Sequence, residues 1–198
     1  MTRTIIGMQR EGKTELTKWF IRRRARPVII VNPLAEKYPG RSFAVFNHTR
    51  PDIAMLEHIM ERGLYISEPL NLISPDPAHF STICEVVKRH GNITLIVDEI
   101  DMFDSARHIE RSFYDLVMYG DGHYQCDIIT TSRRPANISR DLRSQTQEWY
   151  IFRITDGNDL DEFRRLNKEL PDAIASLEPY HYVVYDRRDI VIKPPIPI

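Results

Sequence analysis

Eight residues near the start of the chain, GMQREGKT from Gly7 to Thr14, restrict the possible folds more than any other segment. They fit the pattern G-x-x-x-x-G-K-[ST] at every fixed position, and a match by chance has a probability on the order of one per cent. The apolar segment RTIIG precedes them, and the helix-forming segment KTELTKWFIRRR follows. The sequence therefore predicts a strand, a phosphate-binding loop and a helix, in that order.

The chemistry of phosphate binding explains the residue types of this motif. Gly7 and Gly12 allow the backbone to curl, so that its N–H groups point toward phosphate oxygens. The helix that follows presents its positive amino end to the same oxygens. We expect Lys13 to reach the β- and γ-phosphates of ATP and the Thr14 hydroxyl to bind Mg²⁺.

A second motif, in ITLIVDEI, supplies acidic side chains. Its unbroken apolar run indicates a central strand of a parallel sheet, covered on both faces. Asp98 and Glu99 follow at the carboxyl end, where ligands bind in open α/β sheets. We expect Asp98 to complete the Mg²⁺ site and Glu99 to activate the attacking water, whereas Asp101 is interpreted as a surface or helix-entry residue. The alternative is a buried strand that ends in solvated acids.

Apolar runs and striped helical segments alternate along the chain, which predicts an α/β fold with a mainly parallel sheet. Further strands are expected in PVIIV, SFAVFN, CDIITTS and WYIFRIT, and a hairpin that turns at DRRD in the C-terminal YHYVVYDRRDIVIKP. Helices are expected in DIAMLEHIMERG and PAHFSTICEVVKRHGN, which end at Gly63 and Gly91, from about Ala106 to Tyr119, near ISRDLRSQ, and in NDLDEFRRLNKEL, with Asn158 as its cap.

Length and composition set broader limits. A chain of 198 residues fits one domain, residues 1–198, and a net charge of −1 gives no overall signature of nucleic-acid binding, so DNA contacts would come from local patches. The two cysteines lack CxxC spacing, which predicts neither a zinc site nor a disulfide framework and favours a reducing compartment. Because there is neither an apolar run of ~18 residues nor a signal-peptide pattern, we expect a cytoplasmic protein without its own transmembrane segment.

The segment TTSRRPANISRDLRSQTQEWYIFRITDGNDL adds a third motif. The order of motifs in the chain resembles that of the FtsK–HerA superfamily of DNA-pumping ATPases. The motifs are a phosphate loop, a strand ending in Asp-Glu, a polar sensor strand followed by Arg-Pro, and an arginine-bearing strand before Asn-Asp-Leu. The resemblance covers the chain from Ile5 to about Tyr185. It implies a P-loop NTPase fold of RecA-like (ASCE) type and a homo-oligomeric ring that moves double-stranded DNA with ATP.

The chain departs from the superfamily pattern at two places. The sensor residue is commonly glutamine, and Arg133 stands there, so Thr131 or Ser132 are alternatives for the contact with the γ-phosphate. The arginine of the HerA-type R-[ILV]-T-x-x-N-D-L stretch matches Arg153, whereas Trp149 occupies the FtsK-type arginine position. The arginine that would act on a neighbouring subunit's nucleotide stays open among four residues: Arg153, Arg143, Arg140 and Arg134.

Length and motif order are similar to those of the small genome-packaging ATPases of tailless icosahedral viruses with internal membranes. This implies a motor that pumps a viral genome into a preformed capsid, with capsid or membrane-vertex proteins as candidate partners and the host cytoplasm and the virion as locations. Two alternatives stay open. One is a HerA-like or conjugative DNA pump of a cell, and the other is a nucleotide-dependent assembly switch that does not move DNA.

Overall fold

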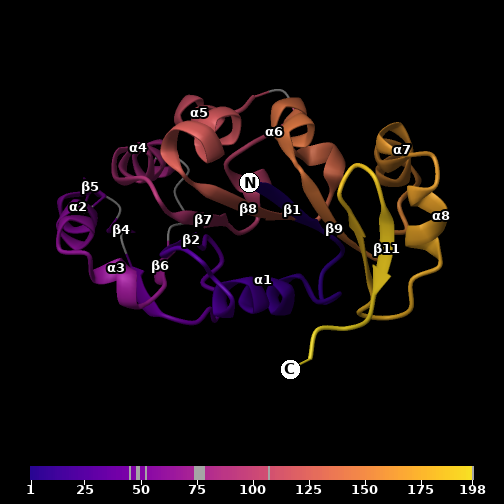
Figure 1. Cartoon of the computed structure of the whole chain (residues 1–198), viewed down its shortest axis with the longest axis horizontal. Coiled ribbons are helices and arrows are strands. Elements are labelled where there is room, and N and C mark those ends of the chain that lie inside the picture. The colour runs from indigo at the N-terminus through magenta and orange to yellow at the C-terminus, as the bar shows by residue number, and fades with distance from the viewer. Residues whose placement is uncertain (45, 48–49, 52, 74–78, 107, 198) are drawn as a thin grey trace.

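The structure is a computed structural model that describes residues 1–44, 46–47, 50–51, 53–73, 79–106 and 108–197. Four expected elements include positions outside the described residues: 45 in the strand SFAVFN, 52 in the helix DIAMLEHIMERG, 77–78 in the helix PAHFSTICEVVKRHGN, and 107 in the helix expected from about Ala106. Within the described part, nine strands form one sheet in the order β11-β10-β9-β1-β8-β7-β2-β6-β3 (Figure 1).

The bounds of the elements follow the sequence motifs closely. The strands of the large sheet are β1 (Thr2–Ile6), β2 (Val28–Val31), β3 (Arg41–Ala44), β6 (Leu70–Ile73), β7 (Thr94–Val97), β8 (Asp127–Ser132), β9 (Glu148–Phe152), β10 (Tyr182–Tyr185) and β11 (Ile190–Lys193), and a separate pair is β4 (Phe46–Asn47) with β5 (Arg50–Pro51). The α-helices are α1 (Lys13–Arg22), α2 (Ile53–Glu61), α3 (Leu64–Ser67), α4 (Phe80–His90), α5 (Arg111–Tyr119), α6 (Arg140–Gln145), α7 (Gly157–Leu166) and α8 (Leu170–Ala175). None of the helices described here is long and apolar enough to cross a membrane.

The prediction of a mainly parallel α/β sheet is confirmed. Strand β8 lies between β1 and β7 and is parallel to both, and all four residues of β7 are buried. Because β1, β7 and β8 run in the same direction, their carboxyl ends meet at one edge of the sheet. The hairpin β10–β11 is antiparallel and pairs with β9, and it turns at DRRD, where Asp186 accepts the N–H groups of Arg188 and Asp189.

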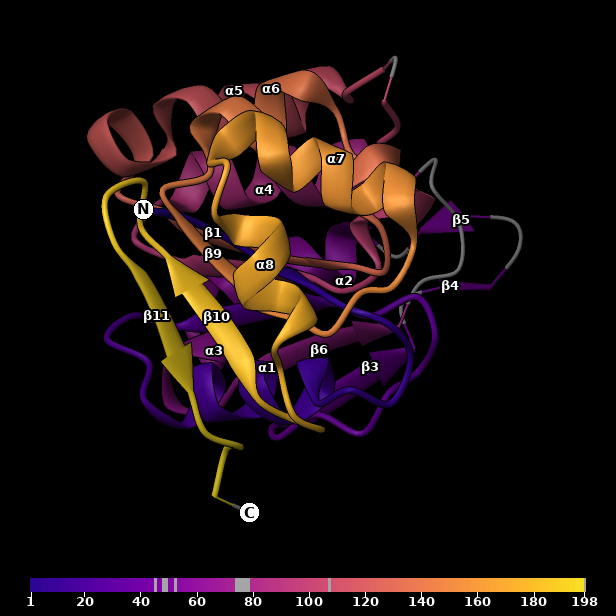
Figure 2. The same cartoon turned by 90° about the vertical axis from the view of Figure 1, so that its right-hand side faces the viewer.

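Helices cover both faces of the sheet. Helix α1 lies on one face, and α4, α5, α6 and α7 lie on the opposite face, as Figures 1 and 2 show. Burial follows this division: a smaller apolar cluster joins Leu16 and Ile21 of α1 to Ile5 and Ile30 of the sheet, and a larger cluster fills the other side. The continuous apolar runs of the central strands arise because both of their faces are covered.

Two expected helix starts were wrong. The helix expected from about Ala106 begins at Arg111, because the Glu110 carboxylate accepts the N–H group of Phe113 and caps the helix there. The cap of α7 is Asp156, whose carboxylate accepts the N–H groups of Asn158 and Asp159, so Asn158 lies inside the helix. Strand β6 and helix α8 were not predicted from the sequence.

Candidate nucleotide-binding site

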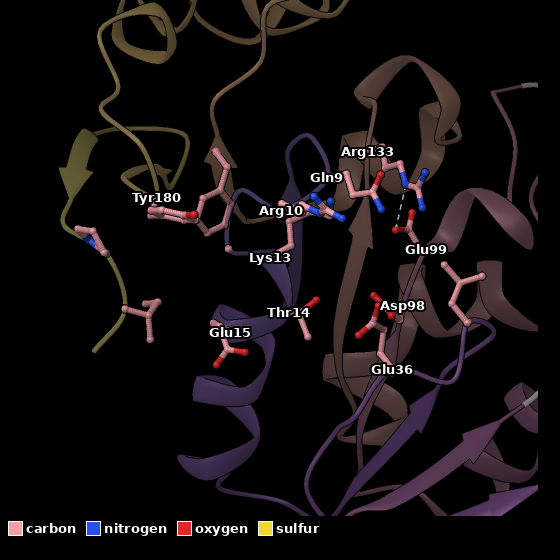
Figure 3. A pocket seen from close by; sticks show the side chains of 15 residues that line it. Gln9, Arg10, Lys13, Thr14, Glu15, Glu36, Asp98, Glu99, Arg133 and Tyr180 are labelled. Carbon is pink, nitrogen blue, oxygen red and sulfur yellow. Dashed lines mark hydrogen bonds and ion pairs between the residues drawn. The ribbon is translucent and has the colours of Figure 1, made fainter. Parts of the chain in front are cut away.

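A cavity of about 580 Å³ opens at the carboxyl edge of the sheet, beside the loop that joins β1 to α1 (Figure 3). Fifteen residues line it: Gln9, Arg10, Gly12, Lys13, Thr14, Glu15, Leu34, Glu36, Asp98, Glu99, Arg133, Phe152, Tyr180, Pro195 and Ile196. Six of the expected site residues are among them, from three separate parts of the sequence. The volume lies within the range of small-molecule sites.

The loop from Gly7 to Thr14 requires its glycines. Gly12 has φ 115°, in the region that favours glycine, and a Cβ atom at Gly7 would lie 2.6 Å from the Cβ atom of Phe152. The N–H group of Gly7 donates to the Ser132 carbonyl at 3.3 Å, which fixes the start of the loop to the end of β8. Strand β9, through Phe152, therefore supports the loop from behind.

Lys13 is folded into this loop. Its Nζ atom donates to the carbonyl oxygens of Gly7 at 2.7 Å and Met8 at 3.1 Å. Burial lowers the pKa of Lys13, and the nearby carboxylates of Glu99 and Asp98 oppose that effect. An ammonium group held by two neutral carbonyls can exchange them for the charged oxygens of a phosphate, which are stronger acceptors.

Asp98 and Glu99 are held together by Thr131 of β8. The Thr131 hydroxyl donates to Asp98 Oδ1 at 2.6 Å and accepts the N–H group of Glu99 at 2.9 Å. Asp98 is buried, and burial raises its pKa against the effect of this hydrogen bond. The hydroxyl of Ser132 instead bonds to the backbone of Arg134. Both alternatives for the γ-phosphate contact thus have their hydroxyls engaged inside the protein.

Glu99 occupies an unusual backbone position. Its φ angle of 47° lies in the left-handed region, and such conformations cluster at functional sites when the surroundings enforce them. Arg133 Nε donates to Glu99 Oε1 at 3.2 Å, and both side chains face the cavity. Burial raises the pKa of Glu99, while the charges of Lys13 and Arg133 oppose the rise. A carboxylate with a raised pKa beside a cavity is suited to accept a proton.

The donor set fits Mg²⁺. Thr14 and Asp98 both line the cavity, and a hydroxyl and a carboxylate are the hard oxygen ligands that this ion binds. Among the residues that the structure describes, no cluster of three or more His, Cys, Asp or Glu side chains could hold a metal ion by itself. Mg²⁺ usually takes one or two protein oxygens together with water and substrate phosphates, which matches this sparse set.

The structure does not place Arg143 or Arg153 in the cavity wall. Arg153 donates to Glu11 of the phosphate loop at 2.8 Å, and Arg143 on α6 pairs with Glu162 on α7. Arg134 is bound to Asp156 and Asp159. Arg133 is therefore the member of the arginine-rich segment that lines the nucleotide cavity.

Sequence reasoning missed several cavity residues. Arg10 lies at a variable position of the first motif and points into the cavity beside Lys13 (Figure 3). Glu36 is fixed by Asn32, which is buried: Asn32 donates to the Glu36 carbonyl at 2.8 Å and accepts the Glu36 N–H group at 2.9 Å. In the sequence, the asparagine at the end of PVIIVN was the local signal of these two hydrogen bonds.

Comparison with known proteins supports the fold assignment. No protein-family model matches the sequence, and no curated protein matches it significantly. The solved structure of the genome packaging NTPase B204 from Sulfolobus turreted icosahedral virus 2 with AMPPCP has a TM-score of 0.81 at 16% identity, covering 100% of this chain and 98% of that chain. B204, the DNA-packaging ATPase from Sulfolobus turreted icosahedral virus, gives 0.75 at 19% identity, covering 98% and 97%.

A third solved structure is VirB4 of Thermoanaerobacter pseudethanolicus, with a TM-score of 0.67 at 9% identity, covering 100% of this chain and 89% of that chain. The likeness to small genome-packaging ATPases that the motifs predict is confirmed as a likeness of fold, over nearly the whole chain. The chain has a P-loop NTPase-like α/β fold with a C-terminal antiparallel hairpin.

Proposed function

We propose that residues 1–198 form an ATP-hydrolysing motor domain that moves double-stranded DNA, as a subunit of a viral genome-packaging machine. One observation carries the proposal: the Gly7–Thr14 loop and the two acids after β7 face one cavity. The fold comparison supports genome packaging as the process that hydrolysis drives, because proteins of the same fold are described as packaging NTPases. DNA and capsid or membrane-vertex proteins are the proposed partners, in the host cytoplasm and the virion.

The site residues divide the work of hydrolysis. Gly12 and the start of α1 cradle the phosphates with backbone N–H groups, while Gly7, whose N–H group is bonded to Ser132, anchors the start of the loop. Lys13 neutralises charge on the β- and γ-phosphates. Glu99 removes a proton from the water that attacks the γ-phosphate. Thr14 and Asp98 would hold Mg²⁺, which when bound neutralises charge on the phosphate oxygens. Arg133 adds a second positive charge on the γ-phosphate side.

The proposal includes a ring of identical subunits. Hydrolysis by P-loop enzymes can gain 10³–10⁵ in rate from an arginine that a neighbouring molecule provides. Arg153 and Arg143 are the candidates for that role, and each is held by a carboxylate of its own chain. A ring would exchange these internal pairs for a contact with the next subunit's nucleotide.

The test is ATP hydrolysis with and without linear double-stranded DNA. We expect Mg²⁺-dependent phosphate release that DNA accelerates severalfold. Lys13→Ala should lose nucleotide binding, as measured by titration with a fluorescent ATP analogue. Hydrolysis that DNA leaves unchanged would favour a nucleotide-dependent assembly switch, and unchanged affinity in Lys13→Ala would reject the phosphate cradle.

A second candidate is a conjugative or HerA-like DNA pump of a cell, which the motif order of the chain also fits. Both candidates share the same ATPase chemistry, so enzyme assays do not separate them. The genes beside this one do: a neighbouring major capsid gene would support packaging, and genes of a conjugation apparatus would support the cellular pump. Binding of the purified protein to empty capsids, measured by co-sedimentation, is the matching biochemical test.

A further inference from the structure

The cavity continues beyond the phosphate loop to an apolar wall. Phe152, Tyr180, Pro195 and Ile196 line this part, and the last two belong to the segment that follows β11. Figure 3 shows Tyr180 on the opposite side of Lys13 from Asp98 and Glu99. The two ends of the cavity therefore differ in chemistry: one has acids and arginine, and the other has aromatic and aliphatic surface.

The segment after β11 is packed onto the fold. Ile196 lies against the apolar cluster beneath α1 that also contains Phe152 and Tyr182. The Phe152 and Tyr182 rings are 5.2 Å apart, so strands β9 and β10 provide a rigid base for this wall. A cavity wall with such support is largely formed before a ligand binds, which reduces the cost of ordering it on binding.

Tyr180 is the least expected member of the wall. It is 55% exposed, although its ring is large and partly apolar, and its φ angle of 64° lies in the left-handed region. A bulky residue in that region is an outlier, and strain of this kind persists where the surroundings impose it, often at ligand sites. The exposed ring faces the cavity and is available for stacking.

We propose that Tyr180, Pro195 and Ile196 form the subsite for the nucleobase, an inference that rests on the proposed ATPase function. The γ-phosphate has to lie near Glu99, because that carboxylate activates the attacking water. With the phosphates along the loop at Lys13, the rest of the nucleotide extends away from Glu99, toward Tyr180. The flat face of a base stacks on an aromatic ring, and the apolar side chains of the C-terminal segment cover it.

The same wall sets the substrate class. Phe152, Pro195 and Ile196 offer the base no side-chain hydrogen-bonding group. Glu15, which lines the cavity on the α1 side, bonds Lys18 through one carboxylate oxygen at 2.7 Å. Recognition then depends on the face of the base more than on its hydrogen-bonding edge, and every base has such a face. The subsite therefore accepts nucleoside triphosphates as a class, and ATP and GTP should bind within about tenfold of each other.

The experiment compares ATP with inorganic tripolyphosphate, which has the charge but no base. Titration calorimetry on the full chain should show that Tyr180→Ala weakens ATP binding about tenfold, with a smaller loss in Ile196→Ala, while tripolyphosphate affinity stays at the wild-type value. Tyr180→Phe, which keeps the ring, should recover most of the ATP affinity. Tyr119→Ala removes an exposed tyrosine elsewhere on the surface and serves as the matched control.

Three results would overturn the base subsite while leaving the ATPase proposal intact. They are unchanged ATP affinity in both alanine variants, an equal loss of ATP and tripolyphosphate affinity in Tyr180→Ala, and a preference for one base above about 100-fold. If the wild-type chain bound neither ATP nor tripolyphosphate, the proposed function itself would be rejected, together with this inference.

Discussion

Replacement of Glu99 by glutamine isolates the chemical step. The amide keeps the shape of the side chain and removes its basicity. The backbone of Glu99 stays anchored, because its N–H group donates to the Thr131 hydroxyl independently of the side chain. The ion pair with Arg133 is lost, but it involves a guanidinium that is 46% exposed, so its loss should cost no more than about 1 kcal/mol of folding free energy.

The kinetic effect should be much larger than this structural effect. A positioned general base contributes about 10²–10⁴ in rate, so hydrolysis by Glu99→Gln should fall at least ~100-fold. That reduction corresponds to at least about 2.7 kcal/mol of transition-state stabilisation. ATP binding should be retained, because the substitution removes a negative charge close to the triphosphate.

The assay is phosphate release under single-turnover conditions, combined with titration of a fluorescent ATP analogue. Asp101→Asn is the matched control: Asp101 lies two residues further along, in the 3₁₀ turn Ile100–Met102, and is not among the residues that line the cavity. If Glu99→Gln kept the wild-type rate and Asp101→Asn lost activity, Asp101 and not Glu99 would be the general base. Loss of ATP binding in Glu99→Gln would also refute the reasoning.

Three further predictions follow from individual contacts. The rate should rise with pH through the raised pKa of Glu99, because the base must be deprotonated. Arg133→Ala should move this acidic limb of a pH–rate profile to higher pH, because it removes a charge that opposes the rise. Gly7→Ala should lower stability by about 1–3 kcal/mol in chemical denaturation, because its Cβ would meet Phe152; an unchanged midpoint would contradict this. Specific activity should increase steeply with protein concentration, and doping Arg153→Ala subunits into wild type should reduce activity more than proportionally; flat and proportional responses would indicate an independent monomer.

The phosphate loop and the two acids could be predicted because each is a short local pattern. The Gly7–Thr14 spacing carries its own mechanism, and the apolar run before Asp98 indicates a central strand. Their meeting in space follows from a rule of parallel sheets, whose carboxyl ends share one edge. No long-range information was needed to bring Lys13 and Glu99 to the same cavity.

Other parts of the site depend on contacts that no local pattern encodes. Tyr180 and Ile196 reach the cavity because β10 pairs with β9 and Ile196 packs against the apolar cluster that α1 shares with the sheet. Thr131 looked like a candidate for the γ-phosphate, yet the adjacent strand places Asp98 within 2.6 Å of its hydroxyl. These arrangements depend on the order of strands in the sheet, which no local sequence pattern predicts.

Helix starts were hard to predict for a related reason: neighbouring residues can compete for the same capping role. In TDGNDL both Asp156 and Asn158 are residue types that cap helices. Asp156 caps the helix because its carboxylate accepts two N–H groups at once, at 3.0 and 3.2 Å. The sequence shows the candidates, and the difference in hydrogen bonding between them decides the boundary.

The internal ion pairs also discriminate between the two candidate arginine fingers. The Arg153 side chain is 44% exposed, so a neighbour can reach it, but its partner Glu11 is only 10% exposed and would be left largely buried without its counter-charge. Arg143 is 23% exposed and its partner Glu162 is 20% exposed, so this guanidinium is less accessible to a neighbouring subunit. Arg153 is thus the arginine that a neighbour could reach more easily, provided that Glu11 gains another partner. Its release would also free Glu11 beside the phosphate loop, so one exchange of partners would connect subunit contact with the electrostatics of the nucleotide site.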